Sequence, residues 1–71
     1  MSRMTAQIVE TELRTHDLQG LETEIGEHHL SLWYPHGYVE LQHKAEKVGM
    51  TIAMKADLSI QVYDHEVRLN F

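Results

Sequence analysis

Histidine is the residue type that first suggests chemistry, because it occurs six times in 71 residues. Imidazole rings bind zinc or copper and carry protons near neutral pH. The spacing argues against a metal site, since the chain has no His-Glu-x-x-His motif and no cysteine. Three of the histidines also fall in expected turns: His28, His36 and His65. We predict no cofactor, with a histidine-dependent metal-binding protein as an alternative.

Other side chains that could catalyse a reaction do not form a recognisable arrangement. The three serines lack the flanking glycines of a nucleophile elbow, and the four glycines stand six, eleven and twelve residues apart, too far for a phosphate-binding loop. The carboxylates are numerous, but on strands with one apolar face we expect them to point into water. A chain of this length also has little volume for a ligand cavity. We predict a protein that is not an enzyme.

Acidic residues are concentrated in the first 30 residues, which hold six acids and two bases, a net charge of −4. The remaining 41 residues hold five acids and four bases, a net charge of −1. If residues 9–15 form a strand paired with residues 21–25, four carboxylates share one outer face: Glu10, Glu12, Glu22 and Glu24. Such an acidic strip can attract a basic partner or imitate a phosphate backbone, although alternating charge also keeps an exposed strand soluble.

Trp33 is the residue that most suggests a binding surface. The alternation that packs Leu32 and Tyr34 inward turns Trp33 outward, and Tyr38 also lies on an outward face. Exposed aromatic side chains often anchor protein interfaces. Trp33 could instead pack under a loop or helix, or stack on a nucleobase, which the net charge of −5 disfavours. We predict a partner-binding site of Trp33 and Tyr38 with Glu10, Glu12, Glu22 and Glu24.

Apolar residues recur at every second position over much of the chain, which is typical of strands. A shift of one residue would turn every side chain to the opposite face, so the pattern specifies the register. It predicts hairpins centred on residues 27–28 and 64–65. The apolar pairs expected in these hairpins are Ile25–Leu30, Thr23–Leu32, Val62–Val67 and Ile60–Leu69.

Two segments are ambiguous. A third hairpin centred on residues 36–37, followed by a strand from Met50 to Val62, continues the same alternation. Residues 38–48 also carry a helical stripe, and Gly49 would suit the end of that helix. Residues 5–18 can form either a helix with Val9 and Leu13 on one face, or a strand.

The simplest interpretation is a mainly β domain, an antiparallel meander curled into a small barrel or half-barrel with at most one or two short helices. The alternative is an α+β fold with a helix at about 38–48 packed on an antiparallel sheet. We expect one domain over residues 1–71, with residues 1–5 disordered. No apolar run exceeds three residues, so we expect no membrane span and a cytoplasmic protein.

Together these features predict a small acidic accessory or regulatory protein. Its expected partner is a protein with a basic surface, such as a nucleic-acid-handling protein that it would inhibit. We expect no direct contact with nucleic acid or membrane. A homo-oligomeric structural subunit, in the simplest case a homodimer, is an alternative because a sheet with one apolar face can bury that face against a second copy.

Overall fold

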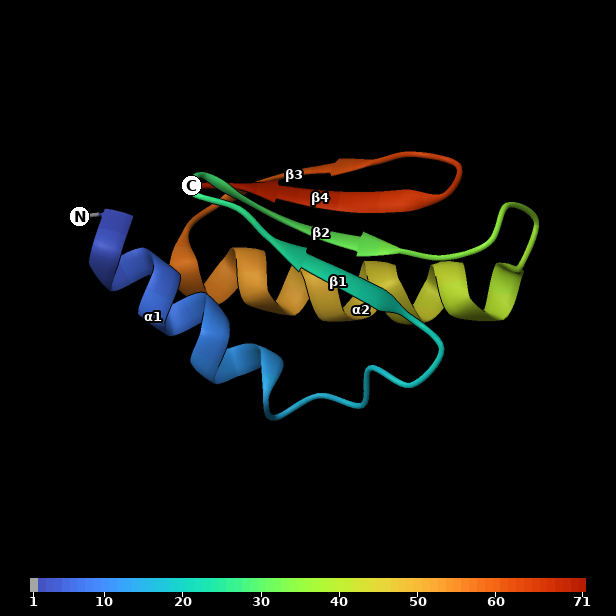
Figure 1. Cartoon of the computed structure of the whole chain (residues 1–71), viewed down its shortest axis with the longest axis horizontal. Coiled ribbons are helices and arrows are strands. Elements are labelled where there is room, and N and C mark those ends of the chain that lie inside the picture. Colours follow the sequence, from blue (N-terminus) through green and yellow to red (C-terminus); the bar gives the residue numbers. More distant parts are fainter. Residues whose placement is uncertain (1) are drawn as a thin grey trace.

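Two helices and four strands make up the chain, whose computed structural model describes residues 2–71, with side chains from residue 6 onward. Both helices lie on the same side of a single antiparallel sheet (Figure 1). In chain order the elements are α1 (Ser2–Leu13), β1 (Glu22–Ile25), β2 (His29–Trp33), α2 (Val39–Ala56), β3 (Ser59–Val62) and β4 (Glu66–Asn70). The fold is therefore α+β with an open sheet. The mainly β barrel was the wrong choice, and the α+β alternative fits.

The sheet consists of two hairpins joined along their inner strands, in the order β1-β2-β4-β3. Strands β2 and β3 both pair antiparallel with β4, so they run in the same direction on either side of it. Helix α2 connects them and crosses β4, with which it packs (Figure 1). This arrangement is a split βαβ unit.

The registers predicted for both hairpins are confirmed. Ile25 pairs with Leu30 and Thr23 with Leu32 in the first hairpin. The second hairpin has Ile60 opposite Leu69 and Val62 opposite Val67. Pairing of β2 with β4 then brings four fully buried side chains together beneath the middle of the sheet: Leu30, Leu32, Val67 and Leu69. These side chains form the centre of the core.

Helix α2 replaces the predicted hairpin at residues 36–37 and most of the predicted strand from Met50. Its buried residues follow a spacing of three to four, as a helix with one covered face requires, and are Ala45, Val48, Gly49, Ile52 and Ala53. The apparent alternation from Met50 has no structural counterpart, since Met50 and Met54 are 53% and 84% exposed. The helix ends at Asp57, which adopts the left-handed conformation (φ 57°) and donates its backbone N–H to the Ala53 carbonyl.

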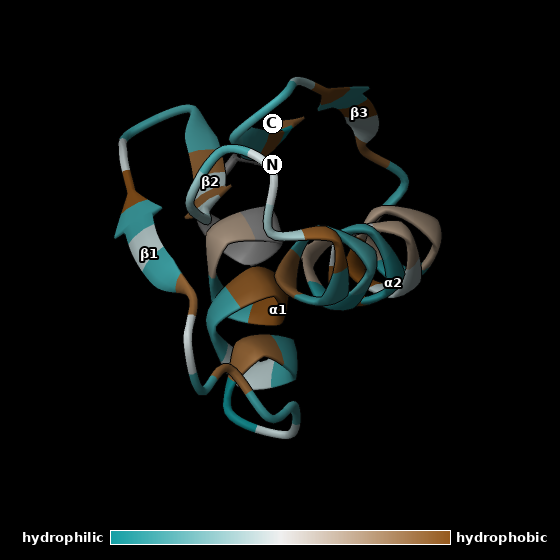
Figure 2. Cartoon of the chain, turned by 90° about the vertical axis from the view of Figure 1, so that its right-hand side faces the viewer, coloured by the Kyte–Doolittle hydropathy of each residue, from teal (hydrophilic) through white to brown (hydrophobic). Residues whose placement is uncertain are grey.

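Helix α1 settles the ambiguity at residues 5–18 in favour of a helix, so the strand expected at residues 9–15 is wrong. It packs beside α2 and buries Val9 and Leu13, and both helices lie on one side of the sheet in a second view (Figure 2). The disorder expected for residues 1–5 falls partly outside the described residues. Of that segment the structure describes only the backbone of residues 2–5, in the first turns of α1. Among the described residues, no helix is long and apolar enough to span a bilayer.

Candidate binding surface on the open face of the sheet

The face of the sheet opposite the helices carries polar side chains almost throughout. Because side chains alternate along a strand, the residues between the buried leucines and valines all point to this side. The β2–β4 register places Trp33 opposite Glu66, Ser31 opposite Arg68 and His29 opposite Asn70. We call this surface the open face, and its members are Glu22, Glu24, His29, Ser31, Trp33, Gln61, Glu66, Arg68 and Asn70.

Trp33 is half-buried on the open face and is held there by two neighbours, Glu24 and His65. Its indole Nε1 donates to Glu24 Oε1 at 3.3 Å, and the other carboxylate oxygen of Glu24 lies 3.3 Å from His29 Nε2. The indole also stacks on the His65 ring, with centroids 5.7 Å apart and planes inclined by 13°. The outward direction predicted for Trp33 is thus confirmed, and its ring is fixed in position.

Ser31, Glu66 and Arg68 form a polar cluster near Trp33 on the open face, in which the serine and the glutamate are buried and the Arg68 side chain is 38% exposed. Ser31 is 0% exposed and donates its hydroxyl to Glu66 Oε2 at 2.5 Å. The Nε of Arg68 donates to the same oxygen at 3.1 Å. A carboxylate taken out of water needs such charged and hydrogen-bonded partners. The cluster therefore makes this part of the surface rigid and satisfies its polar groups internally.

The predicted acidic strip divides into two separate parts. Glu22 and Glu24 are exposed on β1, and Glu22 is the register partner of Trp33. Glu10 and Glu12 lie on α1, on the helix side of the sheet, because residues 9–13 are helical. Glu12 there forms an ion pair with Lys55 Nζ at 3.2 Å. Only the β1 half of the strip is next to Trp33.

Tyr38 lies outside the sheet, at the residue that precedes the first turn of α2. Its side chain is 50% exposed, in the connection that follows β2. Tyr34, at the other end of the same connection, is only 5% exposed and donates its hydroxyl to the Tyr63 carbonyl at 2.7 Å. Burial, reinforced by the negative charges of Glu46 and Asp64, raises the pKa of the Tyr34 hydroxyl.

Several residues on or beside the open face were not among the predicted site residues, including His29, His65, Glu66 and Arg68. Gln61 lies opposite Arg68, but that pair belongs to one hairpin, whose register says nothing of Trp33. The missing information was the pairing of β2 with β4, which brings Glu66 beside Trp33. Within residues 2–71, no group of three or more histidine or acidic side chains is placed to hold a metal ion.

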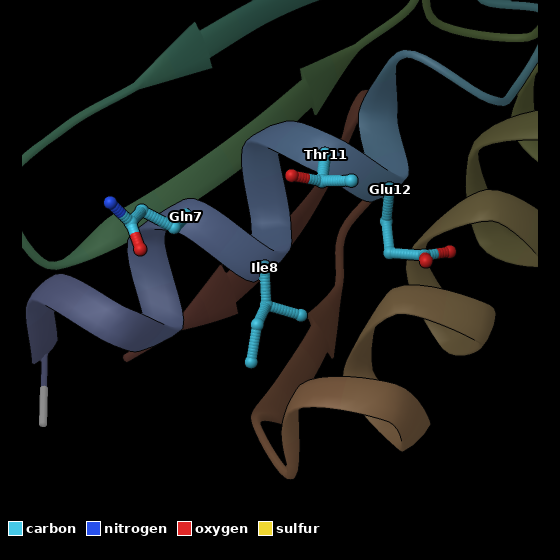
Figure 3. Close-up of a pocket in the computed structure, with 4 residues that line it drawn as sticks. All are labelled: Gln7, Ile8, Thr11 and Glu12. Atoms are coloured by element: carbon cyan, nitrogen blue, oxygen red, sulfur yellow. The ribbon is translucent and has the colours of Figure 1, made fainter.

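A hollow of about 260 Å³ lies on α1 and not on the open face. Its four lining residues, Gln7, Ile8, Thr11 and Glu12, all come from that helix, and Glu12 points toward α2 (Figure 3). With side chains from one helix only, it offers a ligand few convergent groups.

Fold and surface together define an α+β protein with a polar, tryptophan-bearing open sheet face. Comparisons of the chain with protein-family models, with curated proteins and with solved structures found no match. The function is accordingly inferred from the surface itself.

Proposed function

We propose that the protein is a non-enzymatic binding protein whose open face contacts a partner protein with a basic surface. The observation that carries this proposal is the position of Trp33, half-buried on a sheet face that neither helix covers. A large aromatic ring in such a place adds contact area that only a partner would bury completely.

The fixed geometry of Trp33 favours binding because little conformational freedom remains to be lost. The indole is already hydrogen-bonded to Glu24 and stacked on His65. Ordering a free side chain at an interface costs about 0.5–1.5 kcal/mol, and a ring that is ordered beforehand avoids most of that cost.

Charge supports a basic partner. The open face carries three carboxylates, Glu22, Glu24 and Glu66, against the single cation Arg68. Because Arg68 pairs with Glu66, it does not neutralise the two exposed glutamates of β1, although Glu24 is also bonded to Trp33 and His29. Within this proposal, an accessory or regulatory role in the cytoplasm, including inhibition of a nucleic-acid-handling protein by occupying its basic groove, remains the more specific hypothesis.

Affinity capture from a cell extract with the immobilised full chain tests the proposal. We expect Trp33→Ala to abolish capture of the main retained proteins while lowering the melting temperature by less than about 8 °C, since its indole contacts surface groups and not the core. Capture should also weaken at high salt, because screened charges attract a basic partner less.

Met54→Ala is the matched control, since Met54 is 84% exposed but lies on α2, away from the open face. This variant should retain the same proteins as the unaltered chain. Equal capture by the Trp33 and Met54 variants, or capture that salt does not affect, would contradict the proposal.

A second candidate function is a homo-oligomeric structural subunit. It is favoured by apolar side chains left open on the two edge strands, Ile25 on β1 (46% exposed) and Val62 on β3 (50% exposed). Unpaired edge strands can pair with a second copy, although strands of four residues offer few hydrogen bonds. Sedimentation that shows a monomer at all concentrations would exclude this candidate.

A further inference from the structure

The two edge strands of the sheet differ in charge. Strand β1 forms one edge and β3 forms the other, and each has four residues. Two of the four residues of β1 are glutamates, Glu22 and Glu24, whereas β3 has no charged residue. Charged side chains are a common means of preventing an edge strand from pairing with another chain. The edge at β1 has this protection, and the edge at β3 lacks it.

The backbone of β3 directs every second residue to the free edge of the sheet. At the hairpin turn, Tyr63 donates its backbone N–H to the Glu66 carbonyl at 2.7 Å. Because hydrogen-bonded pairs alternate along an antiparallel ladder, Gln61 also directs its backbone groups toward β4. Ile60 and Val62 consequently direct theirs to the free edge. These two residues offer an added strand two N–H donors and two C=O acceptors.

The same two residues present apolar side chains at this edge. Val62 is 50% exposed, and Ile60 is partly buried against the core. Both lie on the helix side of the sheet, opposite Val67 and Leu69 of β4. Gln61, between them, is exposed on the open face. A strand that fits this edge needs apolar side chains on the helix side and an uncharged polar side chain on the open face, which is the pattern of β3 itself.

We propose that the protein forms a dimer in which β3 pairs antiparallel with β3 of a second copy. Gln61 lies opposite Gln61 of the partner subunit, and Ile60 lies opposite Val62 of the partner subunit. This register joins the residues whose backbone groups reach the free edge, so it forms four hydrogen bonds between the chains. The inference rests on the second candidate function, an assembly of identical subunits, and assigns the surface through which they associate.

The neighbouring registers of this pairing are less favourable. A register centred on Ile60 brings Leu58 to the interface, but the Leu58 backbone N–H already donates to the Ala53 carbonyl at 2.9 Å. A register centred on Val62 places Ile60 opposite the charged residue Asp64, which belongs to the turn and not to the strand. Only the register centred on Gln61 uses the strand alone.

Pairing of two β1 strands is disfavoured by charge. Gly26 donates its backbone N–H to the His29 carbonyl at 2.8 Å, so the same alternation directs Thr23 and Ile25 to the free edge of β1. The corresponding register places Glu24 opposite Glu24 of the partner subunit. Like charges directly opposite each other destabilise a sheet. The β3 edge is therefore the one that fits a second copy.

Sedimentation equilibrium of the full chain over a range of concentrations tests the proposal. We expect a monomer–dimer equilibrium in the unaltered chain. Val62→Lys should raise the dimer dissociation constant about tenfold or more, because each dimer loses two apolar pairs and gains two charges at the interface. Its circular dichroism should remain that of the folded chain, since Val62 is half-exposed in the monomer.

Ile25→Lys is the matched control, because Ile25 is 46% exposed on the other edge strand. This variant should dimerise as the unaltered chain does. A monomer at all concentrations, or equal weakening by the Val62 and Ile25 variants, would overturn the proposal.

Cysteine cross-linking tests the register. The chain has no cysteine, so Gln61→Cys introduces a single thiol. Opposite residues of a non-hydrogen-bonded pair have Cα atoms about 4.5 Å apart, within the range of a disulfide. Oxidised glutathione should therefore convert most of this variant into a covalent dimer. In Ser59→Cys, on the same strand and the same face, the two thiols belong to positions about 13 Å apart and should not cross-link. Equal cross-linking of both variants, or none in Gln61→Cys, would overturn the proposal.

Trp33→Ala separates this inference from the proposed partner binding. Trp33 lies on β2, and β4 separates β2 from the edge at β3. The variant should dimerise with the same dissociation constant as the unaltered chain although it no longer captures the partner protein. Loss of dimerisation in Trp33→Ala would overturn the assignment to the β3 edge.

Discussion

Tyr34 and Tyr38 lie at the two ends of the connection between β2 and α2, in opposite environments. Tyr34 ends the alternation of β2 on the covered side of the sheet, and its hydroxyl is satisfied by the Tyr63 carbonyl. Tyr38 precedes α2 with half of its side chain in water. The buried phenol of Tyr34 must be neutral to keep donating its hydrogen bond.

Alkaline unfolding should therefore depend on Tyr34. Its pKa in the folded chain is raised above the ordinary value of 10.0, chiefly by burial. The unfolded chain releases this proton first, so the stabilisation is complete below pH 10 and is lost as the pH rises through the higher folded pKa. We expect the free energy of unfolding, measured in urea from pH 8 to pH 11, to fall less steeply with pH in Tyr34→Phe than in the unaltered chain. An equally steep decline in the Tyr34 variant would contradict this assignment.

The burial of Ser31 and Glu66 could not be predicted from the residues one at a time. Alternation correctly places both on the outer side of the sheet, where exposure is the ordinary expectation. Their burial follows from neighbours contributed by two strands, since Ser31 and Glu66 are separated by 35 positions in the chain. Because no local pattern records that proximity, the polar cluster beside Trp33 could not be predicted.

Among the elements, the two hairpins were predictable because each is specified within about a dozen consecutive residues. The alternation of apolar side chains and the turn positions at 27–28 and 64–65 suffice to give their registers. The pairing of β2 with β4 joins distant segments, and it is absent from the expected meander. The predicted site residues therefore include Glu22, Glu24 and Trp33 of the open face and none of its residues on β4.

Helix α2 was harder to predict for another reason. Its sequence fits both the alternation of a strand and the three-to-four spacing of a helix. The helical stripe at residues 38–48 predicted the start of the helix well, because α2 begins at Val39. Gly49 was expected to end the helix, yet it lies in the interior, facing β3 and β4. A glycine inside a helix costs about 1 kcal/mol relative to alanine. Close packing on the sheet, which local sequence does not reveal, offsets that cost.

Gly49→Ala should consequently destabilise the protein. A Cβ at this position would lie 2.8 Å from Val67 Cγ1 and 3.3 Å from Ile60 Cδ1, so the helix or the sheet would have to shift. Overpacking of this kind typically costs about 1–3 kcal/mol, more than the gain in helix propensity. We expect a lower urea midpoint than for the unaltered chain. Met50→Ala, at the exposed neighbouring residue, should change the midpoint little, and a more stable Gly49 variant would argue against the close approach.

For the molecule as a whole, one layer of helices and one layer of strands share a single core. Val9 and Leu13 of α1 belong to the same buried cluster as Leu30 and Leu69 of the sheet. The proposed partner surface lies on the side of the sheet that faces away from this core. It can therefore be altered without removing side chains that hold the two layers together.

A shared core predicts that both layers unfold together. Fluorescence of Trp33, the only tryptophan, reports on the sheet, and circular dichroism at 222 nm reports mainly on the helices. We expect coincident urea transitions by both probes, as in a two-state domain. Leu13→Ala should lower both midpoints by the same amount, through a loss of about 2–5 kcal/mol. Loss of the helical signal before the fluorescence change would show that α1 docks as a separate unit.

Strand β4 lies between β2 and β3 in the sheet, and this topology affects the order in which the elements can fold. Either hairpin can close on the microsecond scale from contacts a few positions apart, which requires little loop-closure entropy. Pairing of β2 with β4 costs more loop-closure entropy, because Ser31 and Glu66 are separated by 35 positions that include α2. We therefore expect the pairing of β2 with β4 to limit the rate of folding, with α2 and these two strands in the folding nucleus.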